Sequence, residues 1–211
     1  MKNIALIGML AALAACGSKP PQPAWRGNAA SSLAAFSDAY LKGDTTIADA
    51  EFARARMEMA STARPDMVAH AELHRCATRA AALVYDDCPG FQALARDTTP
   101  AEQAYAAYIA GRLDGLNAAL LPAQHQGVAS AKGKLAAIED PLSRLVAAGV
   151  LMKAGRVTPE DIAVATDTAS AQGWRRPLMM WLGVSLKRAQ DAGDSAQAAR
   201  IQRRIDLATS K

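Results

Sequence analysis

The chain has 211 residues, of which 51% are hydrophobic and only 5% aromatic, and its net charge is +4 at neutral pH. This length suits one domain with a substantial core and argues against several domains. Alanine dominates the apolar content and β-branched runs are few, a composition that favours helices packed closely on small side chains over sheets.

The N-terminal segment has the features of a secretory signal peptide. Lys2 supplies a positive start, residues 4–15 form an apolar run, and small residues precede Cys16. The run is too short for a membrane span, which needs about 20 apolar residues. We therefore expect residues 1–15 to direct export and then to be removed.

Residues 13–16 (LAAC) resemble the lipobox of bacterial lipoproteins. The resemblance implies cleavage by the type II signal peptidase, a diacylglyceryl group on the sulfur of Cys16, and a fatty acyl chain such as palmitate on its amine. Two or three acyl chains anchor a protein durably, whereas one is marginal. An ordinary signal peptide with an incidental cysteine is the alternative. Neither residue after Cys16 is an aspartate, which favours a periplasm-facing location on the outer membrane over the inner one.

A proline-rich segment follows the cysteine. Residues 17–23 contain three prolines. Such a segment is extended and semi-rigid, so it would hold the domain about 20 Å from the membrane at about 3.1 Å per residue. We expect residues 16–27 to form the lipidated tether and residues 28–211 to form a single all-helical domain.

After Trp25 the chain predicts a succession of helices, and no segment shows the alternation of a strand. Residues 99–102 (TPAE) form a capping box with proline at the first helical position. Residues 115–133 show no clear pattern, because proline and glycine interrupt it. Helices are predicted to begin at Ser31, Thr46, Pro65, Thr99, Asp140, Thr158, Arg176 and Ser195, and to end at Gly43, Gly111, Gly155, Gly173 and Gly193.

Two of the predicted turns resemble those of tetratricopeptide hairpins. Gly43-Asp44 is followed at helical spacing by Ala48, Phe52 and Ala55, and Gly193-Asp194 is followed by Ala198. The resemblance implies an all-α fold of antiparallel helical hairpins stacked as in an α-solenoid.

Two cysteines remain once Cys16 carries lipid, and an even pair in an oxidising compartment is most simply a disulfide. Cα atoms in a bridge lie about 4.4–6.8 Å apart. If the helix that carries Cys76 continued to Tyr85, the three residues to Cys88 would reach back at most about 10 Å, so closure would be only just possible. If that helix ends near Ala82, closure is easy. The turn sequence CPG at residues 88–90 favours the reversal, and we predict the disulfide.

His70 and His74 are four residues apart and therefore lie on one face of a helix, a spacing that can hold zinc or copper. The glutamate between them does not fit the metalloprotease motif, and no third ligand is evident. A surface or structural pair is the alternative. We predict no metal or other cofactor, with this pair as the candidate if a metal binds.

No catalytic motif is evident. The sequence lacks the G-x-S-x-G elbow, the P-loop and the dinucleotide-binding glycine pattern. The neighbouring carboxylates of Asp86 and Asp87 suit a turn or a cap better than an acid–base pair. We predict a protein that is not an enzyme, with a cell-wall enzyme of non-contiguous site as an alternative.

Positive charge is concentrated in the last third, where ten Lys and Arg face six Asp and Glu from Val150 onward. We predict an interaction face there, with a solvated helix surface as the alternative. The predicted function is a scaffold that the lipid on Cys16 holds to the membrane and that binds another envelope protein. A metal- or small-ligand-binding lipoprotein is the alternative, and nucleic acid is not expected in the envelope. The predicted face comprises Trp174, Arg175, Arg176, Arg200, Arg203 and Arg204.

Overall fold

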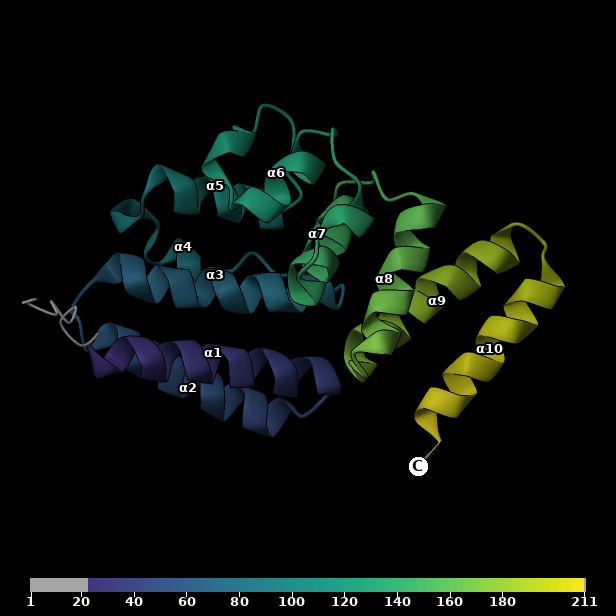
Figure 1. Cartoon of the computed structure of the whole chain (residues 1–211), viewed down its shortest axis with the longest axis horizontal. Helices are drawn as coiled ribbons and strands as arrows, with labels where there is room; N and C mark the ends of the chain where they lie inside the picture. Colours follow the sequence, from purple (N-terminus) through teal and green to yellow (C-terminus); the bar gives the residue numbers. More distant parts are fainter. Residues whose placement is uncertain (1–22, 211) are drawn as a thin grey trace, which may run out of the picture.

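The computed structural model describes residues 23–210, and all regular structure in this range is helical (Figure 1). Cys16 and the predicted signal peptide lie outside the described residues. None of the described helices is both long and apolar enough to cross a membrane. The α-helices are α1 (Ala24–Lys42), α2 (Thr45–Ala60), α3 (Pro65–Ala81), α4 (Pro89–Gln92), α5 (Pro100–Ile109), α6 (Ala123–Ala129), α7 (Pro141–Lys153), α8 (Pro159–Ala171), α9 (Arg175–Asp191) and α10 (Ser195–Thr209), with short 3-10 helices η1 (Ala95–Asp97), η2 (Ala118–Leu120) and η3 (Leu135–Ala137).

α1 and α2 form an antiparallel hairpin against which α3 packs (Figure 1). Gly43 ends α1 in the left-handed conformation, at φ 101°, which glycine adopts without a steric penalty. Asp44 then caps α2 by accepting a hydrogen bond of 3.0 Å from the backbone N–H of Ile47. The hairpin buries Ala48, Phe52 and Ala55, the positions that resemble a tetratricopeptide helix.

The first helix is longer than the sequence predicted. α1 begins at Ala24, with Pro23 before it, and not at Ser31. Trp25 packs against the core, and Ala29 and Leu33 continue its apolar stripe at intervals of four residues. The predicted tether at residues 16–27 was therefore wrong at its end, because residues 24–27 are helical.

Capping residues and prolines in the sequence predicted most of the other helix starts correctly. The capping boxes Thr99–Glu102 and Thr158–Asp161 are both present, with the reciprocal bonds that such a box requires. At the last helix the cap is Asp194 and not Ser195, since the Asp194 side chain accepts a hydrogen bond from the N–H of Gln197 at 2.8 Å.

α3 is the central element of the fold. The α1–α2 hairpin lies on one side of it and α4, α5 and α6 lie on the other, while α7 crosses its C-terminal part (Figure 1). At this crossing an ideal Cβ on Gly149 of α7 would lie 2.1 Å from the carbonyl oxygen of Ala80. Only glycine allows the two backbones to approach this closely.

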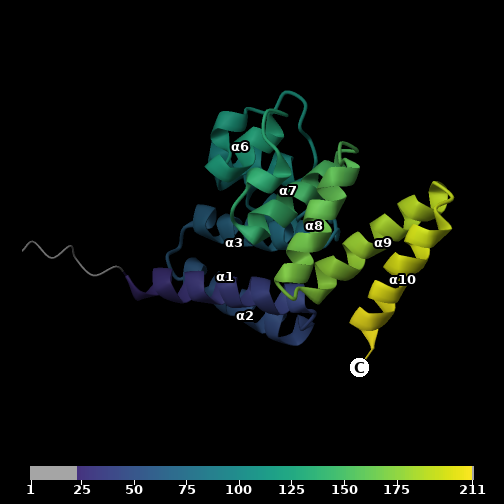
Figure 2. The same cartoon turned by 45° about the vertical axis from the view of Figure 1, so that its right-hand side comes forward.

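The last four helices pack in sequence, each against the next, and carry the chain away from α3 (Figure 2). Trp181 of α9 is fully buried, and its indole N–H donates to the carbonyl of Ala81 at 3.3 Å. α10 forms a separate small cluster with α9 through Ile201, Leu182 and Ala189. The predicted all-α stack of helical hairpins is therefore confirmed.

The disulfide between Cys76 and Cys88 is also confirmed, with the two Cα atoms 5.9 Å apart. α3 ends at Ala81 and Ala82 is its C-cap, so the helix stops early enough for the chain to turn back. The bond fastens the start of α4 to the middle of α3.

Candidate functional site

A cavity of about 550 Å³ lies between α3, α5, α6 and the N-terminal end of α7. This volume is within the range of about 300–1,000 Å³ that small-molecule sites occupy. All three histidines of the chain line it. Most of its wall is apolar, formed by Leu73, Ala77, Leu120, Leu121, Pro122, Leu142 and Val146 together with the ring of Tyr105.

His125 is the least exposed of the three histidines in the cavity, with 2% of its surface exposed. Its Nδ1 is 3.2 Å from the hydroxyl of Tyr108, and the rings of Tyr105 and Tyr108 pack against it at centroid distances of 5.7 and 5.0 Å. Burial lowers the pKa of His125 to about 4, although the carboxylate of Asp140 opposes this shift. The imidazole is therefore neutral at pH 7, and burial keeps both phenols neutral by raising their pKa values.

His74 belongs both to the cavity wall and to a buried polar network between α3 and α1. Its Nε2 is 2.7 Å from the hydroxyl of Ser37, which lies 3.2 Å from the hydroxyl of Thr78. Burial, assisted by an electrostatic interaction with His70, lowers the pKa of His74 to about 4. This ring is thus a neutral hydrogen-bonding partner of α1.

His70 is exposed at the edge of the cavity, one turn before His74. The two imidazoles do line one face of α3, as their spacing predicted. Among residues 23–210, however, no three His, Cys, Asp or Glu side chains are grouped so that they could hold a metal ion.

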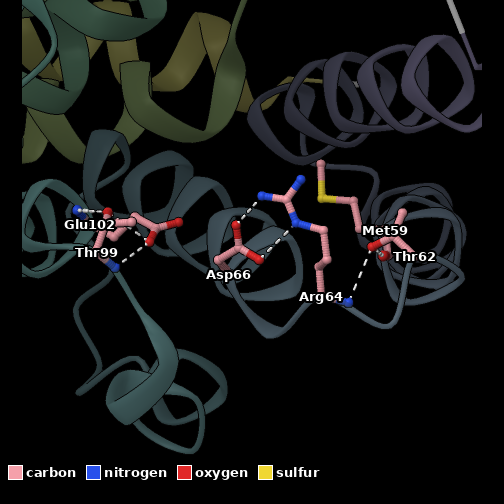
Figure 3. Close-up of polar contacts among 6 residues, drawn as sticks. All are labelled: Met59, Thr62, Arg64, Asp66, Thr99 and Glu102. Carbon is pink, nitrogen blue, oxygen red and sulfur yellow. Dashed lines mark hydrogen bonds and ion pairs between the residues drawn. The ribbon is translucent and has the colours of Figure 1, made fainter.

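Two carboxylates line the cavity, and both cap helices. Oε2 of Glu102 accepts hydrogen bonds from the backbone N–H and the hydroxyl of Thr99, at 2.8 and 3.0 Å (Figure 3). Oδ2 of Asp140 accepts from the backbone N–H of Ser143 at 2.7 Å. Helix formation therefore holds both acidic groups in place at the cavity.

An ion pair lies at the start of α3, drawn together with Thr99 and Glu102 in Figure 3. The guanidinium of Arg64 binds the carboxylate of Asp66 through two nitrogens (Figure 3). This bond lowers the pKa of Asp66. The positive charge of Arg64, the N-cap residue of α3, is thus paired with Asp66 in the first turn of the helix, and Arg64 does not line the cavity.

No protein-family model, curated protein or solved structure matches this chain. The functional assignment therefore depends on the geometry of the chain itself.

Two residues of the predicted basic face pack within the protein, and the other four are exposed. The guanidinium of Arg176 makes contacts within the protein. Its Nε donates to the carbonyl of Tyr40 at 2.7 Å, and an Nη donates to the hydroxyl of Thr45 at 2.8 Å. The guanidinium also stacks on the ring of Tyr40. Trp174 is partly buried against the core, which agrees with the alternative that it seals the end of its helix. The side chains of this set that remain exposed are Arg175, Arg200, Arg203 and Arg204.

Sequence reasoning identified His70 and His74 but missed His125, Tyr105 and Asp140 as members of the same site. His125 lies in residues 115–133, whose pattern could not be interpreted, and Asp140 was recognised only as a helix start. One feature of the sequence could have indicated this site. The chain has only three histidines, so the sequence could have predicted that all three line the same cavity.

Proposed function

We propose that the protein is a lipid-anchored binding protein of the bacterial cell envelope, and that its helical domain holds a small, largely apolar molecule in the cavity between α3, α5, α6 and α7. The observation that carries the binding function is the composition of this cavity: an apolar wall with a few fixed polar groups, among them His125 and Asp140. Small-molecule sites in proteins have this composition. The cavity favours this function over the scaffold that the sequence first suggested.

The anchor and the compartment are proposed from the lipobox-like sequence that ends at Cys16, and the outer membrane is the proposed location. The bond between Cys76 and Cys88 supports export, because structural disulfides persist in oxidising compartments. Mass spectrometry of the mature protein is expected to find an acylated cysteine at its N-terminus. An unmodified N-terminal residue, or retention of residues 1–15, would contradict the anchor.

Blocking the cavity tests the binding function. Ala101 is exposed in the first turn of α5 and lines the cavity, so the substitution Ala101→Trp should cover the opening without disturbing the core. We expect the full chain to bind the neutral fluorophore N-phenyl-1-naphthylamine saturably, and the variant to bind it about tenfold more weakly, a loss of about 1.4 kcal/mol. Fluorescence titration measures both affinities.

The matched control is Ala123→Trp, which adds the same ring at an exposed position in the first turn of α6, outside the residues that line this cavity. This control should bind the fluorophore as the unmodified protein does, and any contribution of the lipid anchor is the same in all three proteins. Equal affinities in all three, or no saturable binding, would contradict the cavity as a ligand site.

The exposed side of α10 favours a second candidate, a scaffold that binds another envelope protein. Leu207 is 78% exposed there, on the helix that also carries Arg200, Arg203 and Arg204. Large exposed apolar side chains beside arginine are typical of interfaces between proteins. Replacing the three arginines by glutamate should remove such a partner while the fold is retained, and retention of every captured protein would contradict the scaffold.

A further inference from the structure

The acidic residues Glu102 and Asp140 line the cavity, and no lysine or arginine does. The buried histidines do not offset this charge at neutral pH, because burial lowers the pKa values of His74 and His125 to about 4. A ligand in this cavity therefore meets an apolar wall and a negative potential.

Each of the two carboxylates keeps one oxygen for a ligand. The capping bonds of Glu102 use Oε2, and that of Asp140 uses Oδ2. Oε1 of Glu102 and Oδ1 of Asp140 accept no hydrogen bond from the described residues. The charge of Asp140 acts on Tyr105 and His125, where it opposes ionisation of the phenol and favours the imidazolium. This carboxylate is itself exposed and lines the cavity close to both rings.

A second polar group points to a ligand independently of the carboxylates. His125 is 2% exposed and lines the cavity. Its Nδ1 pairs with Tyr108, whereas its Nε2 has no hydrogen-bond partner within residues 23–210. This nitrogen is not one of the buried atoms that lack a partner, so it is accessible to solvent and can bond to a ligand in the cavity.

We propose that the cavity binds an organic amine, a molecule with an apolar or aromatic body and one protonated amino group. The body lies against Leu73, Leu142 and the ring of Tyr105, and the ammonium group lies beside the free oxygens of Asp140 and Glu102. Fatty acids, phosphates and other anions are repelled by the same carboxylates. This inference rests on the proposed function, because it requires the cavity to be a ligand site.

The test compares three ligands that share one body and differ in charge: tryptamine, its neutral alcohol analogue tryptophol, and the anionic analogue indole-3-propionate. Displacement of N-phenyl-1-naphthylamine from the full chain gives their affinities. We expect tryptamine to bind about tenfold more tightly than tryptophol at low salt, and indole-3-propionate to bind most weakly. Pairing with a partly exposed carboxylate is worth up to about fivefold in affinity, so two carboxylates account for this preference.

Two substitutions remove the charges and keep the helix caps. Asn is as good an N-cap as Asp, so Asp140→Asn preserves the start of α7. Gln serves at the third position of a capping box, so Glu102→Gln preserves the start of α5. Each variant should weaken tryptamine about threefold, and the double variant about tenfold, without changing the affinity for tryptophol.

Asp194→Asn is the matched control, because Asp194 caps α10 and does not line the cavity. Its affinity for tryptamine should equal that of the unmodified protein. If tryptophol binds as tightly as tryptamine, or if none of the three displaces the fluorophore that does bind, the amine proposal is overturned while the ligand site stands. If the fluorophore itself does not bind, the proposed function fails with it.

Discussion

Substitution of Gly149 by alanine is expected to lower the free energy of unfolding by about 4 kcal/mol. The new Cβ would lie 2.1 Å from the carbonyl oxygen and 2.8 Å from the carbonyl carbon of Ala80. These atoms belong to the backbone of α3, so no rotamer change can make room for the methyl group. α7 would have to move away from α3, and the hydrogen bond of 2.8 Å from the hydroxyl of Tyr85 to the carbonyl of Gly149 would be strained.

Urea unfolding measures this loss, and Gly183→Ala is its control. Gly183 lies in the middle of α9, is exposed, and would bring its Cβ within 4 Å of no atom. Alanine should therefore stabilise this helix by up to about 1 kcal/mol, since glycine loses more backbone entropy on folding. Similar effects of the two substitutions would show that helix propensity, and not the approach of α3 and α7, governs the outcome at Gly149.

These two glycines show what a sequence can and cannot reveal. Both glycines lie inside helices, and the residues next to them in sequence do not distinguish them. What makes Gly149 different is its contact with Ala80 of α3, which lies 69 positions earlier in the chain. The capping boxes at Thr99 and Thr158 could be recognised because both partners lie within three residues. The disulfide could be argued from the reach of a short segment, for the same reason.

The other predictions that the structure corrected also failed because they depend on contacts between residues far apart in sequence. The prolines before Trp25 suggested a tether through residue 27, but burial of Trp25 and Ala29 against later helices extends α1 back to Ala24. The cavity was only partly foreseen. His70 and His74 share a helix and could be paired by spacing, whereas His125 and Asp140 reach the site through an irregular segment whose path depends on α3 and α7.

Acidification from pH 7 to pH 5 is expected to lower the free energy of unfolding by about 4 kcal/mol, through His74 and His125. Burial lowers the pKa of each to about 4 in the folded protein, whereas an unfolded chain gives histidine its ordinary value of about 6.5. Between these values the unfolded state binds more protons, so stability falls as the pH falls. Each histidine contributes about 2 kcal/mol over this interval, and its contribution is fully present only above pH 6.5.

Urea unfolding at pH 7, 6 and 5 tests this dependence. The quantity compared between variants is the slope of the free energy of unfolding against pH, and not the absolute stability. His125→Gln keeps a neutral polar side chain and should remove about half of the slope, and the double variant with His74→Gln should remove nearly all of it. His70→Gln is the control and should keep most of the slope, because His70 is exposed and adds only a secondary contribution to the lowered pKa of His74. A double variant as sensitive to pH as the unmodified protein would mean that the two imidazoles have the same pKa in the folded and unfolded states, as they would if water reached them in the folded protein. A cavity that hydrates in this way would be a poor site for an apolar ligand, so the acid dependence also bears on the proposed function.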